Sequence, residues 1–192
     1  MEVWEGMRIR ETNKKEIVEK LATLGDYVRM EYLSHCLKQA LDYDTKKFVL
    51  VTLSQLYESR GMLLEAGKMM RAAADINTTP AGKISDYIRS IELLIKSRHF
   101  LEVDASMNRA LANASERQRK DIRRGVIALY LLYARDCLKK DRRKHAIEAY
   151  ERVLTFNDLD AQQRQDIHHQ LLSLYERLGK MNDYFSLKRI MK

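Results

Sequence analysis

The sequence predicts an all-α protein, arranged as an α–α superhelix (solenoid) of about five helix–turn–helix repeats. The 192 residues include one proline and seven glycines, and so few helix breakers favour long helices over many short strands. Alternating apolar and polar runs are scarce, and no Asn-Gly or Asp-Gly pair marks a tight hairpin turn. The third observation is a repeated pattern of small and large residues around fixed turn positions.

The repeat is defined by five turn positions, at intervals of 36, 37, 43 and 38 residues: Gly25, Gly61, Arg98, Asp141 and Gly179. A large side chain or a cysteine lies four residues before each turn, and Ala66 and Ala146 lie five residues after two of them. Antiparallel helices cross closely only where a small residue faces a large one. The spacing therefore predicts a helical hairpin at each turn.

The first two repeats cover 13–42 and 45–76, with helices expected over 13–23, 27–42, 45–59 and 63–76. The sequence "NTTPAG" (77–82) is the strongest break in the chain, because it combines a proline with threonine-rich turn chemistry. The third repeat covers 81–113, with helices over 81–97 and 100–113.

The fourth repeat covers 117–156, with helices over 117–139 and 143–156, and the fifth covers 161–191, with helices over 161–178 and 181–191. Ser115 and Gln118 have the spacing of a capping box at the start of the fourth repeat. No flexible linker is long enough to separate domains, so we expect a single domain over 1–192.

The pattern resembles the tetratricopeptide repeat (TPR). In "LSQLYESRGMLLEAGKMMRAAADI" the matching residues are Leu53, Tyr57, Gly61, Ala66, Met70 and Ala73, and "HAIEAYERVL" is similar to the second helix of that repeat. The early tryptophan of the family is absent, and the period exceeds its usual 34 residues, so the chain looks like a divergent relative.

The resemblance implies that the first helix of each repeat lines a concave surface. Its ligand-facing places correspond here to a partner-binding groove of Phe48, Val51, Gln55, Ile88, Glu92, Ile95, Leu131, Arg135 and Leu138. The same places in the fifth repeat are Asp166, His169, Ser173 and Glu176. Contiguous exposed apolar area usually means a partner, so the apolar members are the expected anchors.

The segment "VIALYLLYA" (126–134) is apolar all round, so its helix must be covered on more than one side. Two explanations stay open. The superhelix or a terminus of the chain covers it, or a segment of another protein does.

Net charge is +8, and it is uneven. Residues 1–96 hold 15 Lys+Arg and 14 Asp+Glu, whereas residues 97–192 hold 20 and 13. The excess is concentrated in a basic patch of Arg117, Lys120, Arg123, Arg124, Lys139, Lys140, Arg142, Arg143 and Lys144. Such residues either are solvated at helix ends or bind phosphates or an acidic protein.

Nothing in the sequence calls for catalysis or a cofactor. There is no phosphate-binding loop, no GxSxG and no HExxH, and the five histidines lack metal-site spacing. Cys36 and Cys137 are expected to be free thiols, the N-terminus lacks a secretory signal, and no apolar run could span a bilayer. We expect a cytoplasmic protein that is not an enzyme.

The leading functional hypothesis is therefore a non-enzymatic adaptor or scaffold that binds a partner segment in the groove. The alternative is a basic helical-repeat protein associated with RNA or the ribosome. A third hypothesis is a self-assembling scaffold, because the open ends of a repeat array can stack.

Overall fold

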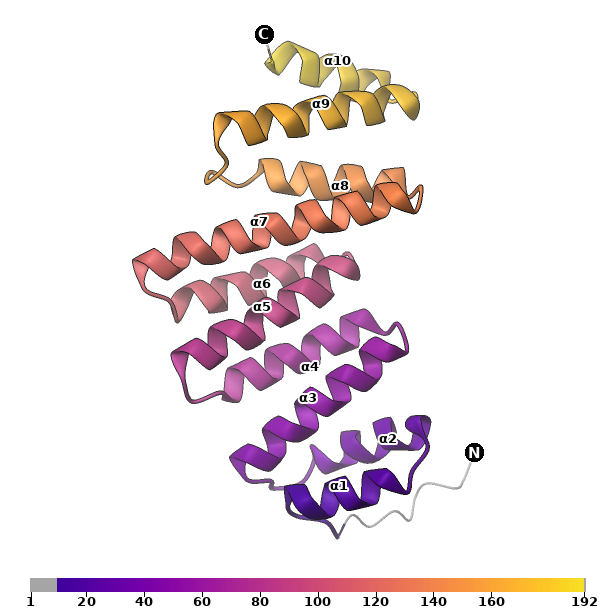
Figure 1. Cartoon of the computed structure of the whole chain (residues 1–192), viewed down its shortest axis with the longest axis vertical. Helices are drawn as coiled ribbons and strands as arrows, with labels where there is room; N and C mark the ends of the chain where they lie inside the picture. Colours follow the sequence, from indigo (N-terminus) through magenta and orange to yellow (C-terminus); the bar gives the residue numbers. More distant parts are fainter. Residues whose placement is uncertain (1–9, 192) are drawn as a thin grey trace. The chain divides into compact units, whose positions relative to one another are not determined.

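The computed structural model describes residues 10–191, and all regular secondary structure in that range is helical (Figure 1). The ten helices of this range are α1 (Lys14–Ala22), α2 (Asp26–Cys36), α3 (Tyr43–Ser59), α4 (Leu63–Ile76), α5 (Pro80–Lys96), α6 (Phe100–Ala112), α7 (Glu116–Lys139), α8 (Arg143–Leu154), α9 (Ala161–Arg177) and α10 (Met181–Ile190). The all-α prediction is confirmed for the described residues.

Helix α2 differs most from its expected bounds, because it ends at Cys36 rather than at residue 42. The Gln39 N–H donates to the Cys36 carbonyl in a tighter turn, and the chain then leaves the helix. Asp42 adopts an extended backbone and its carboxylate accepts a 3.0 Å hydrogen bond from the Thr45 N–H. A residue in the N-cap conformation of α3 cannot belong to the last turn of α2.

Four helix hairpins end their first helix with the same backbone turn. At Gly61, Arg98, Asp141 and Gly179 the backbone φ is positive, between 54° and 74°. In each hairpin the next N–H donates, over 2.8–3.1 Å, to the carbonyl five residues earlier, which belongs to Tyr57, Leu94, Cys137 or Tyr175. This is the Schellman arrangement, which satisfies the last carbonyls of a helix.

Gly25 is the exception among the five turn positions. It has φ −73° and is the N-cap of α2, whereas Thr23 ends α1 in a right-handed conformation. The first repeat was aligned with the other four at Gly25, but its turn does not have their left-handed backbone conformation.

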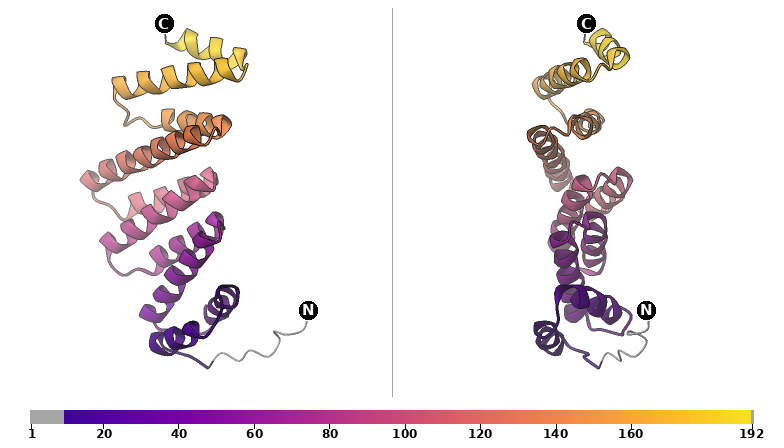
Figure 2. Two further views of the ribbon diagram at one scale, coloured as in Figure 1. Left: turned by 45° about the vertical axis from the view of Figure 1, so that its right-hand side comes forward. Right: turned by 90° about the vertical axis from the view of Figure 1, so that its right-hand side faces the viewer.

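The chain divides into two compact bodies, which we call the N-terminal body (up to Ala114) and the C-terminal body (from Ser115). In the N-terminal body α3 packs on α4, α4 on α5, and α5 on α6, while α1 and α2 pack on α3. In the C-terminal body α7 packs on α8, α8 on α9, and α9 on α10. Edge-on, α7 and α9 (orange to gold) form one layer of the C-terminal body, and α8 and α10 form the other (Figure 2).

The sequence "NTTPAG" is not a boundary between bodies, because α4 and α5 on its two sides pack tightly. The Ser90 hydroxyl donates to the Gly67 carbonyl over 2.8 Å, and the Asn77 side-chain amide donates to the Asp86 carboxylate. The division falls instead just before Ser115, whose side chain and that of Gln118 form the expected capping box of α7.

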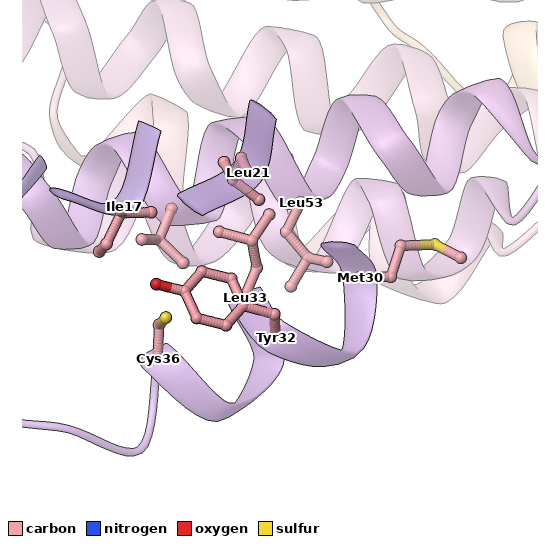
Figure 3. Packing of buried hydrophobic residues seen from close by; sticks show 8 residues of the cluster. Ile17, Leu21, Met30, Tyr32, Leu33, Cys36 and Leu53 are labelled. Atoms are coloured by element: carbon pink, nitrogen blue, oxygen red, sulfur yellow. The ribbon is translucent and has the colours of Figure 1, made fainter. Parts of the chain in front are cut away.

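One core cluster joins the first three helices. It contains Ile17 and Leu21 of α1, Met30, Tyr32, Leu33 and Cys36 of α2, and Val49 and Leu53 of α3 (Figure 3). The Tyr32 side chain is 1% exposed and its hydroxyl lies near the Cys36 thiol. Burial raises the pKa of the Cys36 thiol, so it is an unreactive packing residue.

Two further features bear on function. None of the helices in residues 10–191 is long and apolar enough to cross a membrane. Within the same residues, no group of three His, Cys, Asp or Glu side chains is placed to hold a metal ion.

Candidate functional site

A cleft of about 520 Å³ lies in the C-terminal body. Its lining comes from three helices: Leu131, Arg135 and Leu138 of α7, Tyr150 of α8, and Gln163, Asp166, Ile167, His169 and Gln170 of α9. Apolar and polar side chains alternate along the α7 wall, whereas the α9 wall is polar except for Ile167. Apolar surface with a few polar groups beside it is typical of binding sites. We call this cleft the main cleft.

The α7 wall follows from helical periodicity. Leu131, Arg135 and Leu138 are spaced by four and three residues, so they lie on one face of α7. The buried face of the same helix is formed by Val126, Tyr130, Ala134 and Cys137, each at most 2% exposed. The apolar segment 126–134 is thus divided between the core and the cleft, although Leu132 remains 63% exposed.

A second cleft of about 380 Å³ continues along α7 towards its N-terminus. Arg124, Ile127, Ala128 and Leu131 line it from α7, and Asp158, Asp160 and Gln163 line it from the connection to α9 and its first turn. Leu131 and Gln163 line both clefts, so the two clefts are adjacent, and we call them together the α7–α9 groove.

The structure brings together five side chains that the family resemblance placed on a ligand-facing surface: Leu131, Arg135, Leu138, Asp166 and His169. It adds others that sequence reasoning missed. Tyr150 of α8 is buried, but its exposed 5% lines the main cleft. Gln163 and Gln170 could not be predicted as cleft residues from the sequence, because a glutamine on a helix is usually a solvent-exposed residue.

The Tyr150 hydroxyl forms no hydrogen bond within residues 10–191. Burial raises the pKa of this hydroxyl, and the positive charge of Arg135 opposes the shift. Arg135 is exposed and forms no ion pair among the described residues. Asp166, across the cleft, accepts a 2.9 Å hydrogen bond from the Gln162 amide. The main cleft therefore offers two unused donors on its α7–α8 side.

The groove residues expected in the N-terminal body are more deeply packed. Phe48 is half-buried against the cluster of α1–α3, with the Lys14 ammonium 5.2 Å from its ring centroid, and Val51 packs against the cluster of Ala66, Met70 and Leu93. Ile88 is half-buried and Gln55 is exposed.

Ile95 requires a correction, because it is 1% exposed and cannot contact a partner in this structure. Helix α5 is buried over most of its last turns, where Ile91, Leu93 and Leu94 are also fully enclosed. Glu92 is already engaged within the chain, since its carboxylate accepts hydrogen bonds from Lys96 at 2.6 Å and Arg89 at 2.5 Å.

The basic patch separates into paired and unpaired cations. Arg123, Lys140 and Arg143 form ion pairs with Asp158, Asp136 and Asp141, respectively. Among the described residues Arg117, Lys120 and Arg124 at one end of α7, and Lys139, Arg142 and Lys144 at the other, form none. The charge of the patch is thus partly neutralised within the chain.

No protein-family model matches the sequence, and no curated protein matches it. A solved structure that is similar is the crystal structure of BtubC (BKLC) from P. vanneervenii. The likeness covers 91% of this chain and 76% of that protein, with 16% identity and a TM-score of 0.36. At so low a TM-score the likeness defines neither a fold family nor a function for the chain.

Proposed function

We propose that the protein is a non-enzymatic adaptor built from divergent TPR-like repeats, and that it binds a segment of a partner protein in the α7–α9 groove. The observation that carries the proposal is the main cleft, where Leu131 and Leu138 present apolar surface beside the unpaired Arg135. The equivalent turns at Gly61, Arg98, Asp141 and Gly179 support the repeat assignment.

A protein segment suits this groove for a physical reason. An extended peptide offers apolar side chains at alternate positions and backbone N–H and C=O groups between them. The groove has matching partners for both, because Leu131, Ile127 and Ile167 are apolar, while the side chains of Gln163 and Gln170 donate and accept hydrogen bonds.

We place this activity in the cytoplasm, where the two free thiols would stay reduced.

The alternative function is RNA or ribosome association through the basic patch. The observation that favours it is the group of unpaired cations at Arg117, Lys120 and Arg124. Such binding is electrostatic and weakens steeply with salt. Recovery of a partner that survives nuclease treatment and high salt would argue against it.

The adaptor function is tested with a matched pair of substitutions on α7. Leu131 lines both clefts, whereas the adjacent Leu132 is 63% exposed and lines neither. In affinity purification with the full chain as bait, Leu131→Asp should lose the partner that wild type retains, and Leu132→Asp should keep it. Circular dichroism establishes that both variants are folded. Equal recovery by the two folded variants would remove the groove from the proposed function.

A further inference from the structure

One face of α7 carries four cations, of which Arg124 and Arg135 line the groove. Arg117, Lys120, Arg124 and Arg135 fall within about 80° of arc around the helix axis, together with the groove residues Leu131 and Leu138. None of the four cations forms an ion pair within residues 10–191, and Asp121, the acidic residue of α7 nearest to this face, does not pair with them. The α7 wall thus carries cations that no carboxylate of the described residues pairs with, although three carboxylates line the opposite wall.

The groove has a definite length. Arg124 and Leu138 are fourteen residues apart on α7, which is about 21 Å at 1.5 Å per residue. A strand rises about 3.3 Å per residue, so the groove accommodates about six residues of extended chain. Arg124 and Arg135 are about 16 Å apart along the axis, which corresponds to about five residues of that chain.

The donors near Arg135 are suited to a carboxylate. The Tyr150 side chain is 95% enclosed, since 5% is exposed, and its hydroxyl has no partner among the described residues. Its hydroxyl oxygen keeps contact with the cleft, so it can donate to a bound acceptor in place of water. A guanidinium and a phenol that line the same cleft can both donate to one carboxylate.

The α9 side of the groove argues against a nucleic acid. Asp158, Asp160 and Asp166 line it, and their carboxylates would repel a continuous chain of phosphates. Backbone N–H groups of a peptide can instead donate to these carboxylates and to Gln163. The lining also contains no exposed Phe, Tyr or Trp side chain on which bases could stack, since Tyr150 is buried, and His169 is its one exposed ring.

We propose that the α7–α9 groove binds an extended, internal segment of a partner protein in which two Asp or Glu residues about five positions apart pair with Arg124 and Arg135, with apolar residues between them on Leu131. The inference rests on the proposed adaptor function and specifies the chemistry of the segment that the groove selects.

The test uses the full chain and fluorescein-labelled pools of peptides about eight residues long, capped at both ends. One pool has Glu at the second and seventh positions and a mixture of Ala, Ser, Val and Leu elsewhere. This placement reads the same from either end, so the direction of binding does not matter. Two comparison pools have Gln at those positions, or adjacent glutamates at the second and third. Affinity is measured by fluorescence anisotropy.

The spaced-Glu pool should bind about tenfold more tightly than either comparison pool, and its affinity should fall as salt rises from about 50 to about 300 mM. Arg135→Gln should weaken it about tenfold, and Tyr150→Phe should weaken it several-fold without changing the helical spectrum. Lys144→Gln removes an unpaired, exposed cation outside the groove and should leave affinity unchanged.

Three results would overturn the inference. If the Gln pool binds as tightly as the spaced-Glu pool, the groove has no acid preference, although the adaptor function stands as long as Leu131→Asp abolishes binding. If a mixed-sequence single-stranded oligonucleotide binds more tightly and Arg135→Gln weakens it, the ligand is a nucleic acid. If no pool binds, the acidic-segment inference fails, and the pairwise test of Leu131 and Leu132 decides separately on the adaptor function.

Discussion

The Cα atom of Gly67 faces the side chain of Leu94 so closely that a methyl group on Gly67 would lie 2.7 Å from Leu94 Cγ. The contact joins α4 to α5 and leaves no room for a larger residue. Gly67→Ala should therefore lower the free energy of unfolding by about 1–3 kcal/mol, because Leu94 must move within a fully packed core. Urea denaturation of the two proteins measures the difference.

Gly125→Ala is the control for this prediction. Gly125 lies inside α7, and a Cβ atom there would meet nothing within 4 Å. Alanine should stabilise the helix by up to about 1 kcal/mol, because glycine loses more backbone entropy on folding. A Gly67→Ala protein that is as stable as wild type would show that α4 and α5 are not packed as tightly as described.

Arg98 adopts φ 62° at the turn between α5 and α6, where Gly61 and Gly179 occupy the equivalent places of other hairpins. A residue with a Cβ atom in this left-handed conformation destabilises the folded state by about 1 kcal/mol relative to glycine. Arg98→Gly removes this strain whereas Arg98→Ala keeps it, so Arg98→Gly should be more stable than Arg98→Ala by about 0.5–1 kcal/mol, a difference that thermal and urea denaturation can measure.

The reverse substitution tests the same strain. Gly61→Ala, at φ 74° in open space, should destabilise the protein by about 1 kcal/mol through its backbone alone. Gly25→Ala is also in open space but at φ −73°, so it carries no left-handed strain and should cost less, roughly 0.5 kcal/mol, because alanine is a poorer N-cap than glycine. If the two alanine variants were equally stable, the left-handed turn would not be the source of the strain.

Periodicity and turn chemistry predicted the helices well, because each hairpin depends on local signals. The repeat spacing placed Arg98 and Asp141 with Gly61 and Gly179, and these four residues all have positive φ. The end of α2 was missed, since residues 37–41 carry no strong breaker and the decisive signal was the capping carboxylate of Asp42. The division at Ser115 depends on tertiary packing, which no local pattern encodes.

The candidate site was only half predictable. Leu131, Arg135 and Leu138 follow from the face of one helix, so helical spacing sufficed to place them together. Ile95 has the same spacing on α5, but neighbouring helices enclose it. Tyr150 joins the site from another helix, and such a convergence depends on how α8 packs against α7 and α9.

The Tyr87 hydroxyl donates a 2.6 Å hydrogen bond to Asp75, which also accepts from Arg109. Burial, together with the Asp75 carboxylate, raises the pKa of Tyr87 from 10.0 to about 12. Between these values the unfolded chain loses the phenolic proton while the folded chain keeps it. Stability should therefore be complete below about pH 10 and fall by on the order of 2 kcal/mol as the pH rises to about 12.

This pH dependence is measured as the difference between wild type and Tyr87→Phe in urea denaturation at alkaline pH. The variant should lose less stability over the interval, because it has no phenol to ionise, and effects of lysine deprotonation are common to both proteins. Tyr27→Phe is the matched control, since Tyr27 is 77% exposed. Parallel curves for wild type and Tyr87→Phe would contradict the assignment.

Arg164 of α9 connects α9 to the C-terminal end of α8. Its guanidinium donates to the carbonyls of Leu154 at 3.3 Å and Phe156 at 3.2 Å, which lie at the C-terminal end of α8 and just beyond it. These bonds satisfy carbonyls that the helix leaves unpaired and fix α9 against α8, although Arg164 does not itself line the main cleft.

Arg164→Met keeps much of the side-chain volume but removes both bonds. We expect a loss of about 1–2 kcal/mol in the free energy of unfolding, and several-fold weaker binding of the spaced-Glu peptide pool, because α9 would no longer hold Asp166 and Gln170 opposite α7. Gln165→Met, at the neighbouring exposed position, should change neither quantity. If Arg164→Met lowered stability but left peptide affinity unchanged, the walls of the cleft would not depend on these two hydrogen bonds.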